Sequence, residues 1–179
     1  MIKVGFIGAG DISLLHSEGV YSAENAELTG IWNRTREKAE EKSKLFNCRV
    51  FDSVEDLIKS VDVVYVLTNM ETHHQYARQA IDAGKHVLVE KPTAVTIDEI
   101  EDLKKAAREK GVQVVPVHNY IYEPSVTRAK DLIESGKIGD LVSLYVLYNI
   151  HHPESVAARY PGVIRQILTQ HAYCTLYLV

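Results

Sequence analysis

The 179-residue sequence predicts an α/β protein with a doubly wound parallel sheet, followed by the start of an incomplete second α/β domain. Three observations predict this class. Short apolar runs suited to buried strands alternate with segments of helical spacing. The connections between these runs are long enough to hold a helix, as parallel strands require. The first apolar run passes directly into Gly8-Ala9-Gly10 and then into helix-like sequence, as at the first βα turn of doubly wound sheets.

Strand and helix patterns alternate from the first residues onward. The apolar run 2–7 predicts a buried strand, and the segment 12–21 carries Ile12, Leu15 and Val20 at helical spacing. The elements expected next are a strand at 27–32, a charged helix at 35–46, a short strand at 49–51 and a short helix after Ser53. Thr35 and Ser53 stand where these helices begin, and their hydroxyl oxygens can accept hydrogen bonds from first-turn N–H groups.

The next three strands are apolar and rich in valine. Residues 61–67 are almost continuously apolar, as in a strand buried on both faces, and strands are also expected at 86–89 and 112–117. The helices between and after them are expected at 71–83, 96–110 and 123–135. A glycine, which adopts the left-handed conformation of a helix end at little cost, follows each of them: Gly84, Gly111 and Gly136.

The alternation stops at Gly139. A long strand is expected at 141–150 with no helix directly after it, then a polar loop at 151–161 and an apolar helix at 162–179. We therefore divide the chain into a first domain at 1–120 and the beginning of a second domain at 121–179. The second part is too short to bury a core of its own easily.

Composition excludes several classes of function. The net charge of −4 leaves no excess of Lys and Arg for nucleic-acid phosphates, and no segment approaches the length of a membrane helix. The isolated Cys48 and Cys174 indicate neither a disulfide framework nor a metal site, so we expect a reducing cytoplasm. His151 and His152 are adjacent and would point to opposite faces of a strand, so no metal site is predicted.

The glycine turn after the first strand predicts a phosphate site. Gly8 would allow the tight turn, Gly10 would let the backbone approach a pyrophosphate, and the helix beginning near Asp11 and Ile12 would direct its free N–H groups at it. Ser13 stands where a third glycine is usual and is small enough for close helix–strand packing. The alternative is a strand-to-helix turn that binds no ligand.

Three spaced motifs resemble one known family. They are VGFIGAG at 4–10, VDVVYVLT at 61–68 with His73, and AGKHVLVEKP at 83–92. Together they are similar to the Gfo/Idh/MocA NAD(P)-dependent oxidoreductases, over residues 1 to about 141. This resemblance implies a Rossmann domain that binds the dinucleotide, followed by an open, mostly antiparallel α/β domain that holds the substrate. Members of the family usually run to about twice this length.

The resemblance implies roles for two strand ends. The lysine of the Glu-Lys-Pro motif contacts the substrate hydroxyl and the nicotinamide ribose in the family, so Lys91 is the first candidate catalytic residue, with Glu90 beside the cofactor. A cis peptide often precedes the proline, which here is Pro92. Thr68 and Asn69 stand where the family commonly has Thr-Pro-Asn beside the cofactor's ribose and phosphates. The alternative for Lys91 is a surface lysine at a strand end.

Two histidines match further family positions. His73 begins the helix after the Thr68 strand end, and it is a candidate cofactor contact or a structural cap at that helix start. His16 also matches a common position and is interpreted as structural.

The end of the second strand bears on cofactor choice. NAD enzymes place an Asp or Glu there to bind both ribose hydroxyls, whereas this chain has Asn33 and Arg34. No carboxylate would repel a 2′-phosphate, and Arg34 could pair with it. NADP is therefore favoured over NAD. The alternative is that Arg34 and Arg36 simply begin a charged helix.

The second domain is expected to supply the remaining substrate contacts. Asn119 and Pro124 match a family segment in which Ile121 replaces the usual arginine. Tyr120 could line a substrate pocket, and the alternative is that it only packs before the helix. His171 is the candidate general base, because imidazole can take a hydroxyl proton near neutral pH. Four residues earlier the family commonly has a carboxylate, and this chain has Ile167.

The sequence thus predicts an oxidoreductase that interconverts hydroxyl and carbonyl groups on a sugar, cyclitol or related small polyol. The alternative is a catalytically inactive nucleotide-binding or redox-sensing relative that acts through a partner, which the substitutions at Ile121 and Ile167 favour. An exposed strand at 141–150 would need cover, so a homodimer through that strand is expected.

Overall fold

The computed structural model describes residues 1–149, 151, 154 and 163–179, and these residues form two compact units, Met1–Val117 and His118–Val179. The chain divides after Val117, whereas the sequence predicts a domain boundary near residue 120. That the second unit begins a substrate domain stays a prediction.

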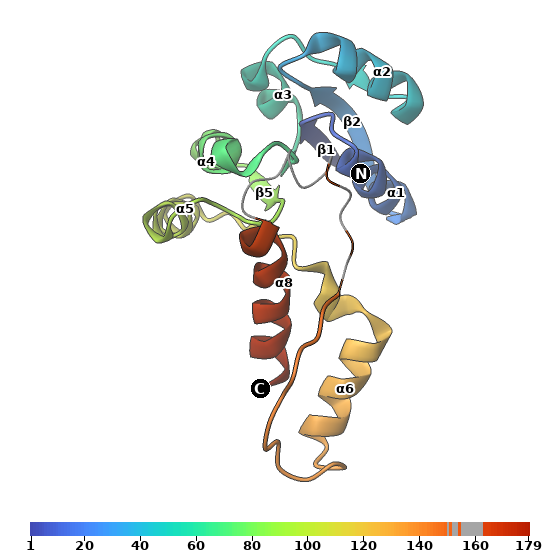
Figure 1. Ribbon diagram of the computed structural model, residues 1–179. Coiled ribbons are helices and arrows are strands. Elements are labelled where there is room, and N and C mark those ends of the chain that lie inside the picture. The colour runs from blue at the N-terminus through green and yellow to red at the C-terminus, as the bar shows by residue number, and fades with distance from the viewer. Residues whose placement is uncertain (150, 152–153, 155–162) are drawn as a thin grey trace. The chain divides into compact units, whose positions relative to one another are not determined.

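The first unit holds six parallel strands in the order β3-β2-β1-β4-β5-β6. Figure 1 labels β1, β2 and β5 of this sheet. They are β1 Ile2–Ile7, β2 Ala26–Trp32, β3 Arg49–Val50, β4 Val63–Val66, β5 His86–Val89 and β6 Val114–Pro116. The predicted doubly wound parallel sheet is confirmed. The strands expected at 61–67 and 112–117 are shorter than predicted, since each is limited to the residues that pair with the four-residue strand β5.

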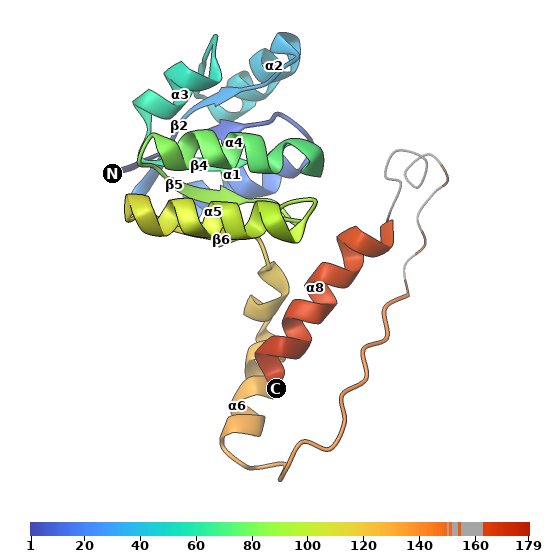
Figure 2. The same cartoon turned by 90° about the vertical axis from the view of Figure 1, so that its left-hand side faces the viewer.

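Helices cover both faces of this sheet. They are α1 Ile12–Ser22, α2 Arg36–Phe46, α3 Val54–Ser60, α4 His73–Asp82 and α5 Ile97–Lys110, with a short 3-10 turn η1 Met70–Thr72 before α4. Helices α1 and α2 pack Val20, Ala39 and Phe46 on one face. Helices α3, α4 and α5 cover the other face, toward which Figure 2 looks. The crossover from β3 to β4 moves the chain between faces, so the strand order reverses beside β1.

The predicted helix boundaries follow local capping chemistry. The Ser53 hydroxyl accepts a hydrogen bond from the Asp56 N–H, and Thr96 forms a reciprocal capping box with Glu99. Thr35 precedes α2 as predicted, but its side chain makes no capping hydrogen bond.

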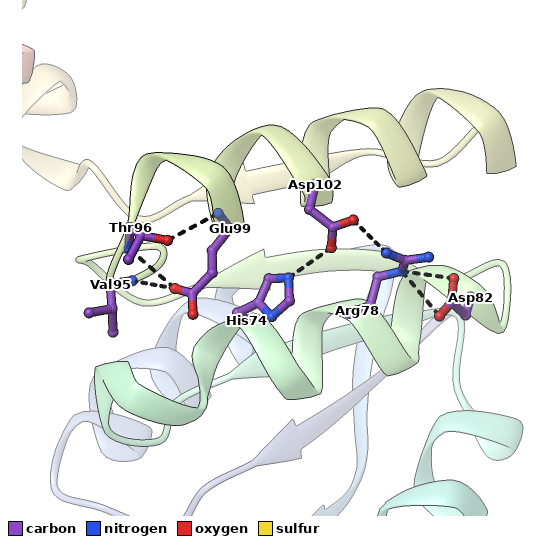
Figure 3. A network of polar contacts seen from close by, with 7 residues as sticks. All are labelled: His74, Arg78, Asp82, Val95, Thr96, Glu99 and Asp102. Atoms are coloured by element: carbon purple, nitrogen blue, oxygen red, sulfur yellow. Dashed lines mark hydrogen bonds and ion pairs between the residues drawn. The ribbon is translucent and has the colours of Figure 1, made fainter.

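A polar network on the outer surface joins α4 to α5 (Figure 3). The Asp102 carboxylate accepts hydrogen bonds from His74 Nε2 at 2.8 Å and from Arg78 Nη1 at 2.7 Å. Arg78 also donates from Nε to both carboxylate oxygens of Asp82. This network fixes the two helices side by side over β5.

The second unit is helical in its described part. It holds the 3-10 turn η2 Asn119–Tyr122, helix α6 Pro124–Glu134 and helix α8 Val163–Leu178, and α8 packs against both α6 and η2. The helices expected at 123–135 and 162–179 are therefore confirmed, with each end one residue inside the expected one.

The strand predicted at 141–150 is wrong over its described residues, because residues 141–149 are not in a strand. The apolar alternation there suits a strand, but backbone N–H and C=O groups need a neighbouring strand, and none stands among the described residues of this unit. Val142 and Leu147 are 94% and 91% exposed. Residue 150 and most of the loop expected at 151–161, His152 included, lie outside the described residues. The expected homodimer stays a prediction, but the exposed strand on which that expectation rested is not present at 141–149.

Two searches of the described residues gave negative results. None of their helices is long and apolar enough to cross a membrane. No group of three or more His, Cys, Asp or Glu side chains in this part of the chain is arranged to hold a metal ion.

Candidate functional site

The carboxyl ends of three strands meet at one edge of the sheet. Ile7 of β1 pairs with Val66 of β4, and Val66 pairs with Val89 of β5. The residues that follow these strands therefore lie side by side: Gly8, Leu67 and Glu90. This edge is where the strand order reverses, and open α/β sheets bind ligands outside such a point.

The glycine turn at the end of β1 has room for a ligand on one side only. Gly8 has φ +118°, and a Cβ there would lie 2.7 Å from the carbonyl carbon and oxygen of Leu67. A Cβ on Gly10 would meet no atom of the described residues within 4 Å, its two chain neighbours aside. Ser13 is fully buried and its hydroxyl donates to the Gly10 carbonyl oxygen, so it occupies the predicted small-residue position.

The start of α1 leaves only some of its N–H groups available. Ser13 and Leu14 donate to the carbonyl oxygens of Gly10 and Asp11, whereas the N–H groups of Asp11 and Ile12 have no acceptor among the described residues. Helix α1 begins at Ile12, as predicted, and the side chain of Asp11 makes no capping hydrogen bond. The first N–H groups of a helix have no intrahelical acceptors, and they carry the positive end of its dipole. The turn can therefore receive an anionic group beside Gly10.

Asn33 connects the end of β2 to the glycine turn. Its Oδ1 accepts a hydrogen bond from the Ala9 N–H at 3.1 Å, and its Nδ2 donates to the Thr35 carbonyl oxygen at 2.8 Å. Asn33 stands where a ribose-binding carboxylate is usual, and here it braces the turn that would hold the phosphates. A direct contact between Asn33 and a cofactor stays a prediction.

The two arginines that follow differ in their partners. Arg36 donates from Nε to Glu40 at 2.8 Å and from Nη1 to Asp52. The hydrogen bond from Arg36 lowers the pKa of Asp52 below its ordinary value. Arg34 is exposed, and its guanidinium makes no hydrogen bond or ion pair with any described residue. Of these two arginines, Arg34 is therefore the one without a partner among the described residues, and it could meet a second anionic group.

The end of β4 is held by a buried histidine. His73, which begins α4, is 1% exposed, and its Nε2 lies 2.9 Å from the carbonyl oxygen of Thr68. Its Nδ1 lies 2.7 Å from the carbonyl oxygen of Pro92. Both ring nitrogens thus contact carbonyl oxygens of the protein. These contacts are the ones expected if His73 is a structural residue at the start of α4. Through them His73 connects the Thr68–Asn69 segment to the Glu-Lys-Pro segment.

The Glu-Lys-Pro segment begins directly after β5. The Lys91–Pro92 peptide bond is cis, as the resemblance implies. Glu90 is buried, and its carboxylate accepts hydrogen bonds from His16 Nε2 at 2.8 Å and from the Lys91 N–H at 3.0 Å. Lys91 is half-buried, and its ammonium makes no hydrogen bond or ion pair with the described residues. A cation is thus held at the edge where the three strands end.

The second unit brings its predicted residues together around Gln170. This side chain is 5% exposed; its Nε2 donates to Asn119 Oδ1 at 2.6 Å, and its Oε1 lies 3.3 Å from His118 Nδ1. The His118 ring stacks on Tyr173 with centroids 4.0 Å apart. Sequence analysis missed Gln170, because no local pattern pairs residues 51 positions apart.

His171 lies between two phenol rings. Its ring centroid is 4.6 Å from that of Tyr148 and 5.9 Å from that of Tyr120. A hydrogen bond with Tyr148, together with burial, raises the pKa of Tyr120 above its ordinary value. The Nε2 atom of His171 is buried without a hydrogen-bond partner among the described residues. Tyr148 was missed by the sequence analysis, since it lies in the segment that was expected to be a strand.

Comparison with known proteins agrees with this geometry. A family model, GFO_IDH_MocA, described as an oxidoreductase family with an NAD-binding Rossmann fold, matches residues 2–118. The chain is 34% identical over 146 residues to glucose-6-phosphate 3-dehydrogenase of Bacillus subtilis, covering 82% of this chain and 42% of that protein. It is 33% identical to scyllo-inositol 2-dehydrogenase (NADP(+)) of the same organism, covering 89% and 44%.

One solved structure is similar over the same region. The WlbA dehydrogenase of Bordetella pertussis, in complex with NADH and UDP-GlcNAcA, superimposes with a TM-score of 0.73 at 28% identity, over 77% of this chain and 41% of that one. The chain thus spans less than half the length of these relatives. Since the family model covers most of the chain and the glycine turn and the Glu-Lys-Pro segment meet at one sheet edge, this chain belongs to the Gfo/Idh/MocA oxidoreductase family, with its NAD-binding Rossmann fold.

Proposed function

We propose that this chain supplies the cofactor-binding part of an NAD(P)-dependent oxidoreductase that interconverts a hydroxyl and a carbonyl group on a sugar, cyclitol or related small polyol. The observation that carries the proposal is the half-buried Lys91, which follows β5 at the sheet edge that also carries the glycine turn and whose ammonium has no partner among the described residues. The names of the two relatives, one acting on a sugar phosphate and one on a cyclitol, support the substrate class.

The residues at the sheet edge fit a dinucleotide. The side of Gly10 is open toward the described residues, and the N–H groups of Asp11 and Ile12 have no acceptor among them, so a pyrophosphate has both space and donors. Gly8 keeps the turn close to Leu67, and Asn33 braces Ala9 from the other side. These contacts preorganise the turn before any ligand arrives.

The chemistry divides between the cofactor and this chain. When bound, the nicotinamide ring accepts or donates the hydride. Lys91 would stabilise the negative charge that develops on the substrate oxygen, because its ammonium has no competing partner among the described residues. His171 would take the hydroxyl proton, for which its Nε2 has no protein partner among the described residues. Asn119 and Tyr120 would contact the substrate.

The free arginine supports NADP as the preferred cofactor. Arg34 is exposed without a partner among the described residues, whereas Arg36 is neutralised by Glu40 and Asp52. A charge-assisted hydrogen bond to a 2′-phosphate contributes roughly 1.5–3 kcal/mol. Arg34→Ala should therefore weaken NADPH binding about 10- to 100-fold while changing NADH binding little. Arg36→Ala is the matched control, and an equal loss from both variants would contradict the assignment to Arg34.

Fluorescence titration with NADPH and NADH tests cofactor binding directly. The expected result is saturable enhancement of nicotinamide fluorescence and a raised melting temperature for the unsubstituted chain. Absence of both responses with both cofactors would overturn the proposal.

Turnover tests the role of Lys91. Glucose 6-phosphate and scyllo-inositol, the substrates that the relatives' names indicate, are suitable first probes. Lys91→Ala should abolish turnover of any accepted polyol and leave NADPH affinity largely intact. Unchanged turnover would show that Lys91 is a surface lysine with no role in catalysis.

One substitution favours a second candidate function. Ile167, on the helix turn before His171, stands where the family commonly has a carboxylate, so the proton-transfer pair is incomplete. An inactive nucleotide-binding or redox-sensing relative would bind NADPH as tightly but turn over no polyol. Cofactor binding with no turnover across a panel of sugars and cyclitols would favour this candidate.

The two cysteines bear on the compartment in which the protein works. Cys48 and Cys174 are both free thiols, which suits a reducing compartment, and we keep the cytoplasm as the proposed location. A homodimer remains the proposed assembly, and light scattering of the purified chain would test it.

A further inference from the structure

Both oxygens of the Glu90 carboxylate are occupied by neighbours that flank the candidate catalytic lysine. His16 donates from Nε2 to Oε1 at 2.8 Å, and the backbone N–H of Lys91 donates to Oε2 at 3.0 Å. The side chains of His16 and Glu90 are 14% and 11% exposed. The Glu90 carboxylate therefore binds the backbone of Lys91. It forms no ion pair with the Lys91 ammonium, whose charge it does not neutralise.

The ring of His16 is itself held by aromatic packing. It meets Phe6 edge-on, with centroids 6.5 Å apart, and Tyr65 edge-on, with centroids 5.6 Å apart. Phe6 lies in β1 and Tyr65 in β4, the two strands beside the point where the strand order reverses. The imidazole of α1 is thus packed against two strands of the sheet while it contacts Glu90.

A second histidine holds the residue on the other side of the lysine. His73 Nδ1 lies 2.7 Å from the carbonyl oxygen of Pro92, and His73 is almost fully buried. Its Nε2 lies 2.9 Å from the carbonyl oxygen of Thr68 at the end of β4. The backbone is thus anchored directly before and directly after Lys91, by residues from α1 and α4.

We propose that His16, acting through Glu90, together with His73, positions Lys91 for the reaction by immobilising the backbone on both sides of it while leaving its ammonium free. This inference rests on the proposed oxidoreductase function. The three residues act as positioning residues, because their polar atoms contact the protein and the lysine backbone. A rigid backbone matters here, since small displacements of a catalytic group can cost large factors in rate.

The deciding variant is His16→Phe, which keeps an aromatic ring against Phe6 and Tyr65 and removes the hydrogen bond to Glu90. Its matched control is His74→Phe, which removes a histidine–carboxylate hydrogen bond of the same length, to Asp102, between α4 and α5. Glu90→Gln is the conservative variant, because an amide oxygen can still accept from the Lys91 N–H. Thermal midpoints check that each variant folds.

Two readouts separate positioning from a merely structural role. The first is amide hydrogen exchange at Lys91, measured by NMR without cofactor. His16→Phe should speed exchange at this N–H by about tenfold or more through local opening, whereas Glu90→Gln should retain most of the protection and His74→Phe all of it. The second is steady-state kinetics on the polyol that the unsubstituted protein accepts. His16→Phe should lower kcat by about tenfold or more, with KM and the NADPH dissociation constant within about twofold.

The outcomes distinguish this inference from the proposed function. Unchanged exchange at Lys91 in His16→Phe would overturn the positioning role, whatever the kinetics. A loss of kcat that is matched by an equal loss of NADPH affinity would also overturn it, since that pattern indicates general damage to the turn. If the unsubstituted protein binds neither cofactor, the proposed function fails, and the exchange measurement still decides whether His16 holds the backbone of Lys91.

Discussion

Gly8 and the carbonyl group of Leu67 are so close that any side chain at position 8 would collide with it. A Cβ on Gly8 would lie 2.7 Å from that carbonyl oxygen, and the residue also has φ +118°, a conformation that L-residues rarely adopt. The contact joins the ends of β1 and β4, which are the two strands between which the strand order reverses. The close approach of Gly8 to Leu67 therefore sets the distance between the glycine turn and the end of β4.

Gly8→Ala should lower stability, whereas Gly10→Ala should lower NADPH affinity. Gly8→Ala should lower the free energy of unfolding by roughly 1–3 kcal/mol or more, because of backbone strain and the collision with Leu67. Gly10→Ala should leave stability nearly unchanged, since its Cβ would contact no described residue other than its chain neighbours within 4 Å. It should weaken NADPH binding by filling the space proposed for the pyrophosphate. Urea unfolding and NADPH titration measure the two effects. Tight NADPH binding by Gly10→Ala would contradict the proposed location of the phosphates.

Removing the buried histidine of α4 should destabilise the first unit. His73→Phe removes the ring nitrogens that lie against the carbonyl oxygens of Thr68 and Pro92. A neutral imidazole donates to one of these oxygens, and leaving a buried acceptor unsatisfied costs about 1–3 kcal/mol. The adjacent substitution His74→Phe removes one half-exposed contact and should cost less than about 1 kcal/mol. Urea denaturation of both variants checks the difference. Equal losses would show that the two carbonyl contacts contribute little.

The Asp102 network should make stability depend on pH. Hydrogen bonds from His74 and then Arg78 lower the pKa of Asp102 below its ordinary value of 3.8 in the folded protein (Figure 3). A carboxylate with a depressed native pKa stabilises the fold above its unfolded pKa, and the benefit is lost as pH falls through the native pKa. Asp102→Asn should therefore lower the urea midpoint at pH 7, with a difference that shrinks below about pH 4. A difference that persists unchanged at pH 3 would argue that packing, and not charge, explains it.

Cys48 should be a slow thiol. Burial raises its pKa to about 11. Because the thiolate is the reactive form, a thiol with this pKa should react at pH 8 roughly 100-fold more slowly than one with an ordinary pKa near 9. Mass-spectrometric timing of iodoacetamide labelling, native against urea-unfolded, measures the ratio. Labelling of native Cys48 at the unfolded rate would show that its surroundings open readily.

Local sequence signals were enough for the elements of the first unit. Apolar runs located the strands, and capping residues such as Ser53 and Thr96 located helix starts, because these effects act within one helical turn. Strand lengths were less accurate, since the end of β4 depends on the length of its neighbour β5. The strand expected at 141–150 was wrong for the same kind of reason: pairing, which periodicity cannot supply, decides whether an extended segment is a strand.

The candidate site was only partly accessible from the sequence. The glycine turn and the Glu-Lys-Pro segment stand in the chain as contiguous motifs, and the resemblance supplied the cis peptide before Pro92. The partners of Glu90 and Gln170 were not accessible. His16 and Glu90 are 74 residues apart, and Asn119 and Gln170 are 51 apart. No periodicity links such distant side chains.

By itself, the sequence determined which elements form, where the glycine turn lies and which family the chain resembles, because these depend on short-range backbone preferences and contiguous motifs. Only the tertiary structure decided that Arg36 is neutralised while Arg34 has no partner among the described residues, and that Asn33 braces the glycine turn. It also decided that Glu90, held by His16, and the buried His73 contact the backbone on the two sides of Lys91. Those relationships depend on which strand ends share a sheet edge. That edge forms only when the crossovers bring β1, β4 and β5 together.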